Sequence, residues 1–176
     1  FAETMRKNIA AVEAAGADTV ITSCPACSMM WRHVYPEWAK KLGIPFNITA
    51  RHYSEVVAEK IAAGEFAFPE NALPEGDGEP VTVTWHDSCH MGRVSHVYEV
   101  PRTLIQAIPG VKYVAMEYNR DNAHCCGSVL TLIKEPPVAV VVGQHRLDEA
   151  LQVAERVPAQ QMADQIDVSL TTIKWH

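Results

Sequence analysis

Hydrophobic residues recur along this chain at two spacings, and each change of spacing marks a predicted element. Residues 1–15 carry apolar side chains every three to four positions and are followed by Gly16, which predicts an amphipathic helix and its C-terminal end. Residues 18–22 form a short β-branched run, which predicts a buried strand. The chain therefore begins with a helix and a strand in direct succession.

The same alternation continues to residue 151, with helical spacing in some stretches and short apolar runs in others. The predicted helices span 29–42, 54–63 with Ser54 as N-cap, a stretch after Cys89 that reaches 108, and 136–151; the predicted strands span 46–49, 81–85 and 111–116. Because valine is a weak helix former, a strand over 138–142 is the alternative to the start of the last helix.

Residues 65–80 interrupt this alternation with prolines, glycines and acidic residues, and they are the best candidate for a linker. We predict a first domain over 1–68, a linker over 69–80 and a second domain over 81–176. Strands that alternate with helices predict parallel βα units, so the fold class is α/β with a short parallel sheet in each half. The cysteine loops follow the C-terminal ends of strands, where open α/β sheets place their ligands.

The composition is that of a globular protein, since 48% of the 176 residues are hydrophobic and 20% are charged. The net charge of −6, without a basic run, argues against nucleic acid as the partner. No apolar stretch reaches the ~20 residues of a membrane-spanning helix. The chain begins at Phe1 without an export signal, so we expect the rear part of a longer cytoplasmic protein, held at the inner face of a membrane only through partners.

The residues that point to chemistry are five cysteines: Cys24, Cys27, Cys89, Cys125 and Cys126. An odd count with two adjacent members is unlike a disulfide framework. The CxxC spacing of the first two, taken alone, fits a zinc site, a redox dithiol or half of a cluster site. The adjacent pair is unusual for tetrahedral zinc and suits a multi-iron cluster, with Gly127 allowing the backbone to come close. We therefore interpret the cysteines as ligands of an iron–sulfur cluster.

Three sequence blocks make this interpretation more specific. HDSCHMGR (86–93), YEVPRTLIQAIPGVKYVAMEYNR (98–120) and HCCGSVL (124–130) together resemble the cysteine-rich CCG domain. That domain occurs in the B and D subunits of heterodisulfide reductase, in the iron–sulfur subunit of glycolate oxidase, and in the K subunit of the dissimilatory sulfite reductase membrane complex. TSCPACSMMWRHVYP (22–36) resembles the CxxC segment that closes the preceding CCG repeat.

The resemblance implies two CCG repeats of the βα type and a noncubane [4Fe–4S] cluster, held by a lone cysteine, the CC pair and a closing CxxC. On that pattern Cys89, Cys125 and Cys126 are ligands of the second repeat, and Cys24 and Cys27 close the first. The resemblance also implies other redox subunits as partners, namely a ferredoxin-like protein, a flavoprotein or a membrane cytochrome. A disulfide or a small thiol is the substrate that it implies.

The sequence departs from the family pattern at one place, because no cysteine follows Cys126 and the closing CxxC expected near residues 160–166 is missing. Two arrangements stay open. Either the five thiolates form one shared site, or the chain holds two incomplete half-sites. The shared site requires the sulfurs of Cys24 and Cys27 to lie within roughly 10 Å of that of Cys125, which is several times a metal–thiolate bond.

Histidines and arginines beside the cysteines are candidates for further roles. We predict that His86, His90 and His124 donate hydrogen bonds to cluster sulfur or relay a proton to a departing thiolate. Arg93 and Arg102 are predicted to neutralise an anionic cluster or to hold a substrate carboxylate. The alternative for each is a structural role as a loop cap or in an ion pair. The remaining histidines are expected on helical stretches, in ordinary surface or core roles: His33, His52, His96 and His145.

The sequence thus favours an iron–sulfur oxidoreductase subunit that either reduces a sulfur–sulfur bond or passes electrons between partners. Two other functions stay open. A structural zinc module would use Cys24, Cys27, Cys89 and one cysteine of the adjacent pair. A thiol–disulfide exchanger would use Cys24 and Cys27 without a metal.

Overall fold

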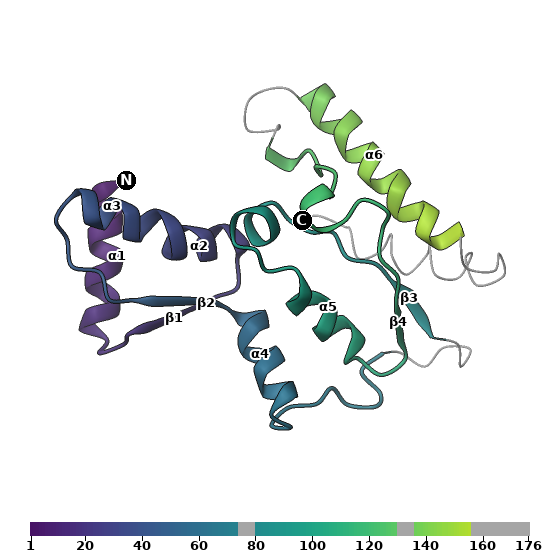
Figure 1. The fold of residues 1–176 in the computed structure, drawn as a ribbon, viewed down its shortest axis with the longest axis horizontal. Helices are drawn as coiled ribbons and strands as arrows, with labels where there is room; N and C mark the ends of the chain where they lie inside the picture. The colour runs from purple at the N-terminus through teal and green to yellow at the C-terminus, as the bar shows by residue number, and fades with distance from the viewer. Residues whose placement is uncertain (74–79, 130–135, 156–176) are drawn as a thin grey trace. The chain divides into compact units, whose positions relative to one another are not determined.

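The residues that the structure describes form two units, each with one two-stranded parallel sheet (Figure 1). The computed structural model describes residues 1–73, 80–129 and 136–155. Unit 1 consists of Phe1–Ala67 and Ser88–Leu104, and unit 2 of Phe68–Asp87 and the described residues from Ile105 onward. The chain therefore enters unit 2, returns to unit 1 and ends in unit 2. The linker over 69–80 stays a prediction, and its residues 74–79 lie outside the described part.

Unit 1 combines one parallel sheet with several helices. Its elements are α1 (Ala2–Ala14), β1 (Thr19–Thr22), α2 (Pro25–Met29), the π-helical η1 (Met30–Val34), α3 (Tyr35–Lys41), β2 (Thr49–His52), α4 (Tyr53–Ala62) and the π-helical η2 (His90–Val94). β1 and β2 run parallel, with Thr22 opposite His52 at their C-terminal ends. α2, η1 and α3 follow one another without a gap, so one continuous helical segment begins directly after Cys24.

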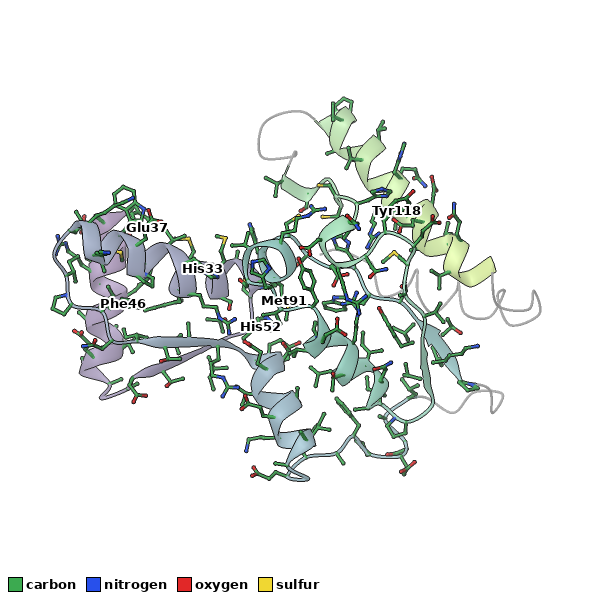
Figure 2. The ribbon with its side chains drawn as sticks, viewed as in Figure 1. His33, Glu37, Phe46, His52, Met91 and Tyr118 are labelled. Carbon is green, nitrogen blue, oxygen red and sulfur yellow. The ribbon has the colours of Figure 1, made fainter. Side chains whose placement is uncertain are left out.

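The core of unit 1 lies between α1 and this helical segment. Met5 and Ile9 are one helical turn apart on α1, and both are buried against Tyr35 and Ile48. Phe46, labelled in Figure 2, packs against the same cluster from the loop before β2, and its ring is tilted by 35° to that of Trp31, with 6.4 Å between centroids. The core therefore fixes the helical segment that begins beside Cys24.

Unit 2 contains the second sheet and the longest helix of the described residues. Its elements are β3 (Val81–Val83), β4 (Val111–Tyr113), the 3-10 turn η3 (Arg120–Asn122) and α6 (Pro136–Glu155), and α5 (Glu99–Gln106) spans the boundary between the units. β3 and β4 are parallel, with Val81 opposite Val111 and Val83 opposite Tyr113. As in unit 1, the C-terminal end of the first strand leads towards a cysteine, here Cys89.

The valine-rich start of α6 is helical, so the alternative strand over 138–142 is wrong. Val140 and Val141 are exposed, whereas the buried positions Ala139, Arg146, Glu149 and Val153 recur at helical spacing. A strand would have placed alternate residues on the same face. None of the helices in the part of the chain that the structure describes combines the length and hydrophobicity needed to cross a lipid bilayer.

The predicted α/β class with short parallel sheets is confirmed, but three local predictions are wrong. The second strand covers 49–52 and not 46–49, because Phe46 and Ile48 pack into the core from a loop. The N-cap of α4 is His52 and not Ser54. The helix expected after Cys89 is two separate elements, since His96 between them has a left-handed φ of 55°.

All four remaining histidines were expected on helical stretches, but two of them do not lie on a helix. His52 ends β2 and His96 lies between η2 and α5, whereas His33 and His145 lie within η1 and α6 as predicted. The predictions for residues 156–176, including the missing CxxC near 160–166, lie outside the described residues.

Candidate functional site

Cys24 and Cys27 form a pair where the chain passes from β1 into α2. Cys24 is the N-cap residue with an extended backbone, and Pro25 is the first helical residue, a position that suits its fixed φ. The thiol of Cys27 donates a hydrogen bond to the sulfur of Cys24. Both side chains are exposed and free of disulfides. The turn therefore presents two neighbouring sulfur ligands at one helix N-terminus.

The two thiols of this pair differ in acidity. Backbone N–H groups of Cys27 and Ala26 donate to the sulfur of Cys24, and these hydrogen bonds lower the pKa of Cys24. The pKa of Cys27 is raised, first by its hydrogen bond to Cys24 and then by burial. Cys24 is therefore the first of the pair to become a thiolate, which is the form that binds metals.

Cys89 lies in unit 1 with this pair. It is the N-cap residue of η2, and η2 packs against α2. The guanidinium of Arg93, one turn further along, donates to the sulfur of Cys89 at 3.7 Å. Unit 1 thus brings together two short helices that each begin at a cysteine, and Arg93 contacts one of these cysteines.

Cys125, Cys126 and Gly127 form a tight turn in unit 2. The backbone N–H of Gly127 donates to the sulfur of Cys125 at 3.3 Å. Gly127 has a left-handed φ of 80°, and a Cβ there would lie 2.4 Å from the carbonyl oxygen of Ala139 on α6. A side chain at 127 would therefore push α6 away from the turn. Glycine is required here for both its conformation and its small size.

Polar groups around Cys126 stabilise its thiolate form. Burial alone would raise the pKa of Cys126, but the hydroxyl and backbone N–H of Ser128 and the positive charge of Arg146 outweigh burial and lower it. The hydroxyl oxygen of Ser128 lies 3.3 Å from the sulfur of Cys126. The turn therefore supplies hydrogen bonds to both sulfurs of the adjacent pair.

A buried ion pair on α6 lies next to this turn, and no sequence motif marks it. Arg146 and Glu149 are only 5% and 6% exposed, and their side chains are 2.5 Å apart. Arg146 also donates to Nδ1 of His86 at 2.9 Å and to the backbone oxygen of Tyr118 at 2.8 Å. An arginine and a glutamate three positions apart on a helix are normally exposed to solvent, so the sequence does not single out Arg146 and Glu149. Their burial beside the cysteine turn identifies them as part of the site.

His124 precedes the adjacent cysteines and is held on two sides. Its ring stacks on that of Tyr118 at 4.2 Å between centroids, and its Nδ1 lies 3.2 Å from the carboxylate of Glu149. Figure 2 shows Tyr118 beside α6. A cavity of ≈240 Å³ opens beside Cys125, lined by His124, Val141, Val142 and His145. His145 was expected to have an ordinary surface or core role, but it lines the same cavity as the predicted ligand Cys125.

The predicted site residues divide between the two units. Unit 1 contains Cys24, Cys27, Cys89, His90 and Arg93, and unit 2 contains His86, His124, Cys125, Cys126 and Gly127. Arg102 is buried and donates to the backbone oxygen of Tyr98 at 2.5 Å. The described residues contain no group of three or more His, Cys, Asp and Glu side chains arranged to hold a metal ion. The shared five-thiolate site and the residue roles stay predictions.

The donor set fits a thiolate-bound metal group. Cysteine is among the most often buried residue types, yet all five cysteines of this chain are exposed. Four of the five sulfurs also accept hydrogen bonds from backbone, hydroxyl or guanidinium groups, which favours the thiolate. Exposed thiolates are the ligands that soft or borderline metals prefer, including the irons of iron–sulfur clusters.

His52 is buried beside the Cys24 loop and gives unit 1 a predicted pH dependence. Burial lowers the pKa of His52, opposed in part by its hydrogen bond to the Ser23 backbone and by the carboxylate of Glu55, and assisted by the charge of Arg32. The unfolded chain therefore takes up a proton near pH 6.5, the ordinary histidine value, before the folded chain does.

We expect the free energy of unfolding to be highest above pH 6.5 and to fall as the pH drops towards the lower pKa of folded His52, by at most about 1.4 kcal/mol per pH unit. Urea unfolding of the metal-free protein at pH 7.5 and 5.5 measures this. His52→Gln, which has no titrating side chain at this position, should remove that part of the pH dependence, and an unchanged dependence in this variant would contradict the assignment to His52.

Comparison with known proteins identifies relatives of this chain. The family model of the CCG cysteine-rich domain matches residues 1–32 and 83–161. Over 128 residues the chain is 34% identical to a probable iron–sulfur-binding oxidoreductase, FadF, of Bacillus subtilis, an alignment that covers 73% of this chain and 16% of the relative. Over 153 residues it is 31% identical to a dihydromethanophenazine:CoB–CoM heterodisulfide reductase subunit of Methanosarcina barkeri, covering 85% and 34%.

A third relative is a probable glycolate oxidase iron–sulfur subunit of Bacillus subtilis, 33% identical over 132 residues that cover 72% of this chain and 27% of the relative. The chain spans about a third or less of the length of each of these relatives. No solved structure matches the chain. Both segments that contain cysteines fall within the residues matched by the family model.

Proposed function

Because this chain belongs to the family of CCG cysteine-rich domains, we propose that it is the cluster-binding part of an iron–sulfur oxidoreductase subunit. The relatives are named as an iron–sulfur-binding oxidoreductase, a heterodisulfide reductase subunit and an iron–sulfur subunit, and the proposal carries that role to this chain. The observation that supports it most strongly is the exposure of all five cysteines, four of which accept hydrogen bonds that stabilise the thiolate.

The proposed cluster is a noncubane [4Fe–4S] cluster held by Cys89, Cys125 and Cys126, with Cys24 and Cys27 either completing the same site or closing a separate one. Such a cluster supplies one-electron transfer when it is bound. Gly127, with its left-handed φ, donates its backbone N–H to the sulfur of Cys125 and lets α6 pack close to the adjacent pair. Arg93 and Arg146 supply positive charge near Cys89 and Cys126, which offsets the charge of several thiolates.

A disulfide is the substrate class that this site would take if the subunit is catalytic. Reduction of a disulfide consumes two electrons and two protons, breaks one sulfur–sulfur bond and yields two thiols. The electrons come one at a time from a partner redox subunit. His124 is the proposed proton donor to a departing thiolate, and its position between Tyr118 and Glu149 at the cavity beside Cys125 supports this role. His86 and His90 are proposed as further hydrogen-bond donors near the cysteine loops.

The second form of this function is electron relay without substrate chemistry. One relative is named an EtfAB:quinone oxidoreductase and another a probable membrane-anchored ferredoxin, which are electron-transfer names. In either form we propose that the full-length protein works with other redox subunits, such as a ferredoxin-like protein, a flavoprotein or a membrane cytochrome. We propose a cytoplasmic location, with any membrane contact made through those partners.

Analysis of iron and acid-labile sulfide in the full-length protein, purified without oxygen, tests the proposal. We expect iron and sulfide in equal amounts and a brown visible absorption that bleaches on reduction. The competing zinc module would give a colourless protein with zinc and no sulfide. A protein that also lacks zinc, and cycles between dithiol and disulfide at Cys24 and Cys27, would point to a thiol–disulfide exchanger instead.

A further inference from the structure

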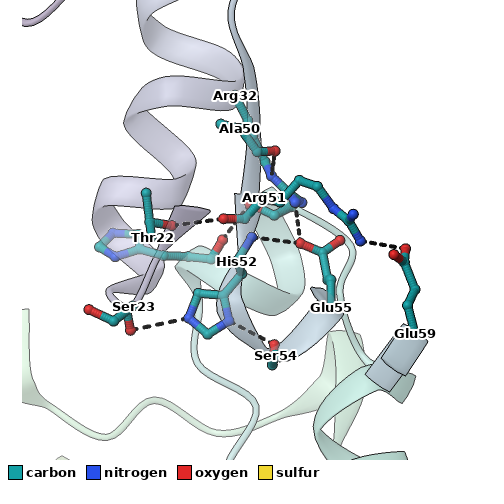
Figure 3. Close-up of polar contacts among 11 residues, drawn as sticks. Thr22, Ser23, Arg32, Ala50, Arg51, His52, Ser54, Glu55 and Glu59 are labelled. Atoms are coloured by element: carbon teal, nitrogen blue, oxygen red, sulfur yellow. Dashed lines mark hydrogen bonds and ion pairs between the residues drawn. The ribbon is translucent and has the colours of Figure 1, made fainter. Parts of the chain in front are cut away.

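A polar network in unit 1 links the end of β2 and the start of α4 to Ser23, directly before Cys24, and His52 is at its centre (Figure 3). His52 is the last residue of β2 and pairs with Thr22, the last residue of β1. The chain then has only Ser23 and Cys24 in which to change from strand to helix. His52 is 5% exposed, and its side chain reaches across the sheet to this two-residue connection.

The hydrogen bonds of His52 require one form of its ring. Nε2 lies 3.2 Å from the backbone oxygen of Ser23, which can only accept, so Nε2 carries the proton. Nδ1 lies 2.7 Å from the hydroxyl oxygen of Ser54, which can donate to an unprotonated Nδ1. The neutral ring with its proton on Nε2 satisfies both partners. Ser54 thereby orients a donor that holds the peptide directly before Cys24.

The backbone around His52 is fixed by a second set of contacts. The carboxylate of Glu55 accepts the backbone N–H of His52 at 2.8 Å and also pairs with the guanidinium of Arg32. Nε of Arg32 donates to the backbone oxygen of Ala50 on β2 at 3.0 Å. Arg32 lies in η1, within the helical segment that begins after Cys24. The segment with the CxxC pair is therefore tied to β2 both before and after its cysteines.

We propose that His52 is a positioning residue, which fixes the backbone oxygen of Ser23 and thereby the direction in which Cys24 and Cys27 present their sulfurs to a metal group. The proposal rests on the proposed function for the identity of that group, but the geometry that it describes exists in the metal-free chain. Because Ser23 and Cys24 are both exposed, the bond from the buried ring of His52 restrains backbone that packing alone holds weakly.

Two substitutions separate the bonds of His52. A glutamine at 52 places an amide N–H near the position of Nε2, so it can still donate to Ser23. An asparagine is shorter and places its oxygen near the position of Nδ1, so it can accept from Ser54 but cannot reach Ser23. His52→Gln therefore keeps the hydrogen bond to Ser23 that the proposal requires. His52→Asn keeps only the hydrogen bond from Ser54.

The test measures how well Cys24 and Cys27 act as a chelating pair. The probe is phenylarsine oxide, which binds two neighbouring thiols, and the protein is the chain with Cys89, Cys125 and Cys126 replaced by serine. We expect His52→Asn to raise the dissociation constant about tenfold, the upper range for one net hydrogen bond. His52→Gln should stay within about twofold of the parent. The melting temperatures of both variants are measured alongside, and we expect a cooperative unfolding transition in each, as for a folded protein.

Equal affinity of the parent and His52→Asn would overturn the proposal, as would an equal loss in both variants, which would indicate simple packing. The ring nitrogens of the unsubstituted protein give a measurement that needs no variant. Its ¹⁵N spectrum should show a protonated Nε2 and a bare Nδ1, and the opposite tautomer would also reject the role. Because neither measurement needs iron, a protein without a cluster would reject the proposed function and leave this test intact.

Discussion

Replacing either Cys125 or Cys126 by serine is expected to remove most of the visible cluster absorption from the full-length protein. Both sulfurs lie in one turn and both accept hydrogen bonds that favour the thiolate. Serine keeps the size of the side chain but replaces a soft thiolate by a hard, weakly acidic hydroxyl, which binds iron poorly. We expect at least a tenfold loss of bound iron and sulfide, measured after purification without oxygen.

The matched control is Val140→Ser, which introduces the same side chain on α6 at a position that is 69% exposed. This variant should keep its full content of iron and sulfide. Full cluster content in both cysteine variants would contradict the proposed ligands, even if the protein proved to contain iron elsewhere.

The second large effect is expected at Gly127. Replacing Gly127 by alanine imposes a left-handed conformation on a residue with a Cβ, and it places that Cβ 2.4 Å from the backbone oxygen of Ala139. The neighbour is backbone within a helix, so it cannot rotate away as a side chain could. We expect the free energy of unfolding to fall by about 3 kcal/mol or more, from conformational strain and overpacking together, measured by urea unfolding.

Gly16→Ala separates the two causes. Gly16 has a similar φ of 68°, but a Cβ there meets no atom within 4 Å. Only the conformational cost applies, so we expect a loss of about 1 kcal/mol. If Gly127→Ala costs no more than Gly16→Ala, then α6 does not pack tightly on the cysteine turn.

Most of the elements followed from the sequence because their signals are local. Helical spacing before Gly16 and β-branched runs at 18–22 and 81–85 depend on neighbouring residues only, and the structure confirms a helix and two strands there. The five cysteines and Gly127 were likewise recognisable from their spacing. The structure adds that Gly127 packs against Ala139, a contact between residues that are distant in sequence.

The errors occurred where packing outweighs local preference. Phe46 and Ile48 have the composition of a strand, but burying them in the core of unit 1 requires a loop, and the polar residues Arg51 and His52 then take the strand positions. At the start of α6 the predicted helix is confirmed and only the alternative strand is wrong, because the valines favour a strand locally but the helix buries one face that includes Ala139 and Arg146. Whether such a segment becomes a strand, a loop or a helix depends on its packing against residues that are distant in sequence, and a short stretch of sequence does not show that packing.

What the sequence by itself determined is the chemistry of this protein: five thiols, their spacing, and the membership in a cysteine-rich family that they indicate. The tertiary structure alone decided which groups surround those thiols. Arg146 and Glu149 became a buried pair beside Cys126, and His52 came to hold the backbone before Cys24. Ligand type is a property of a single residue, whereas burial, hydrogen bonding and charge at a site arise from segments that meet only on folding.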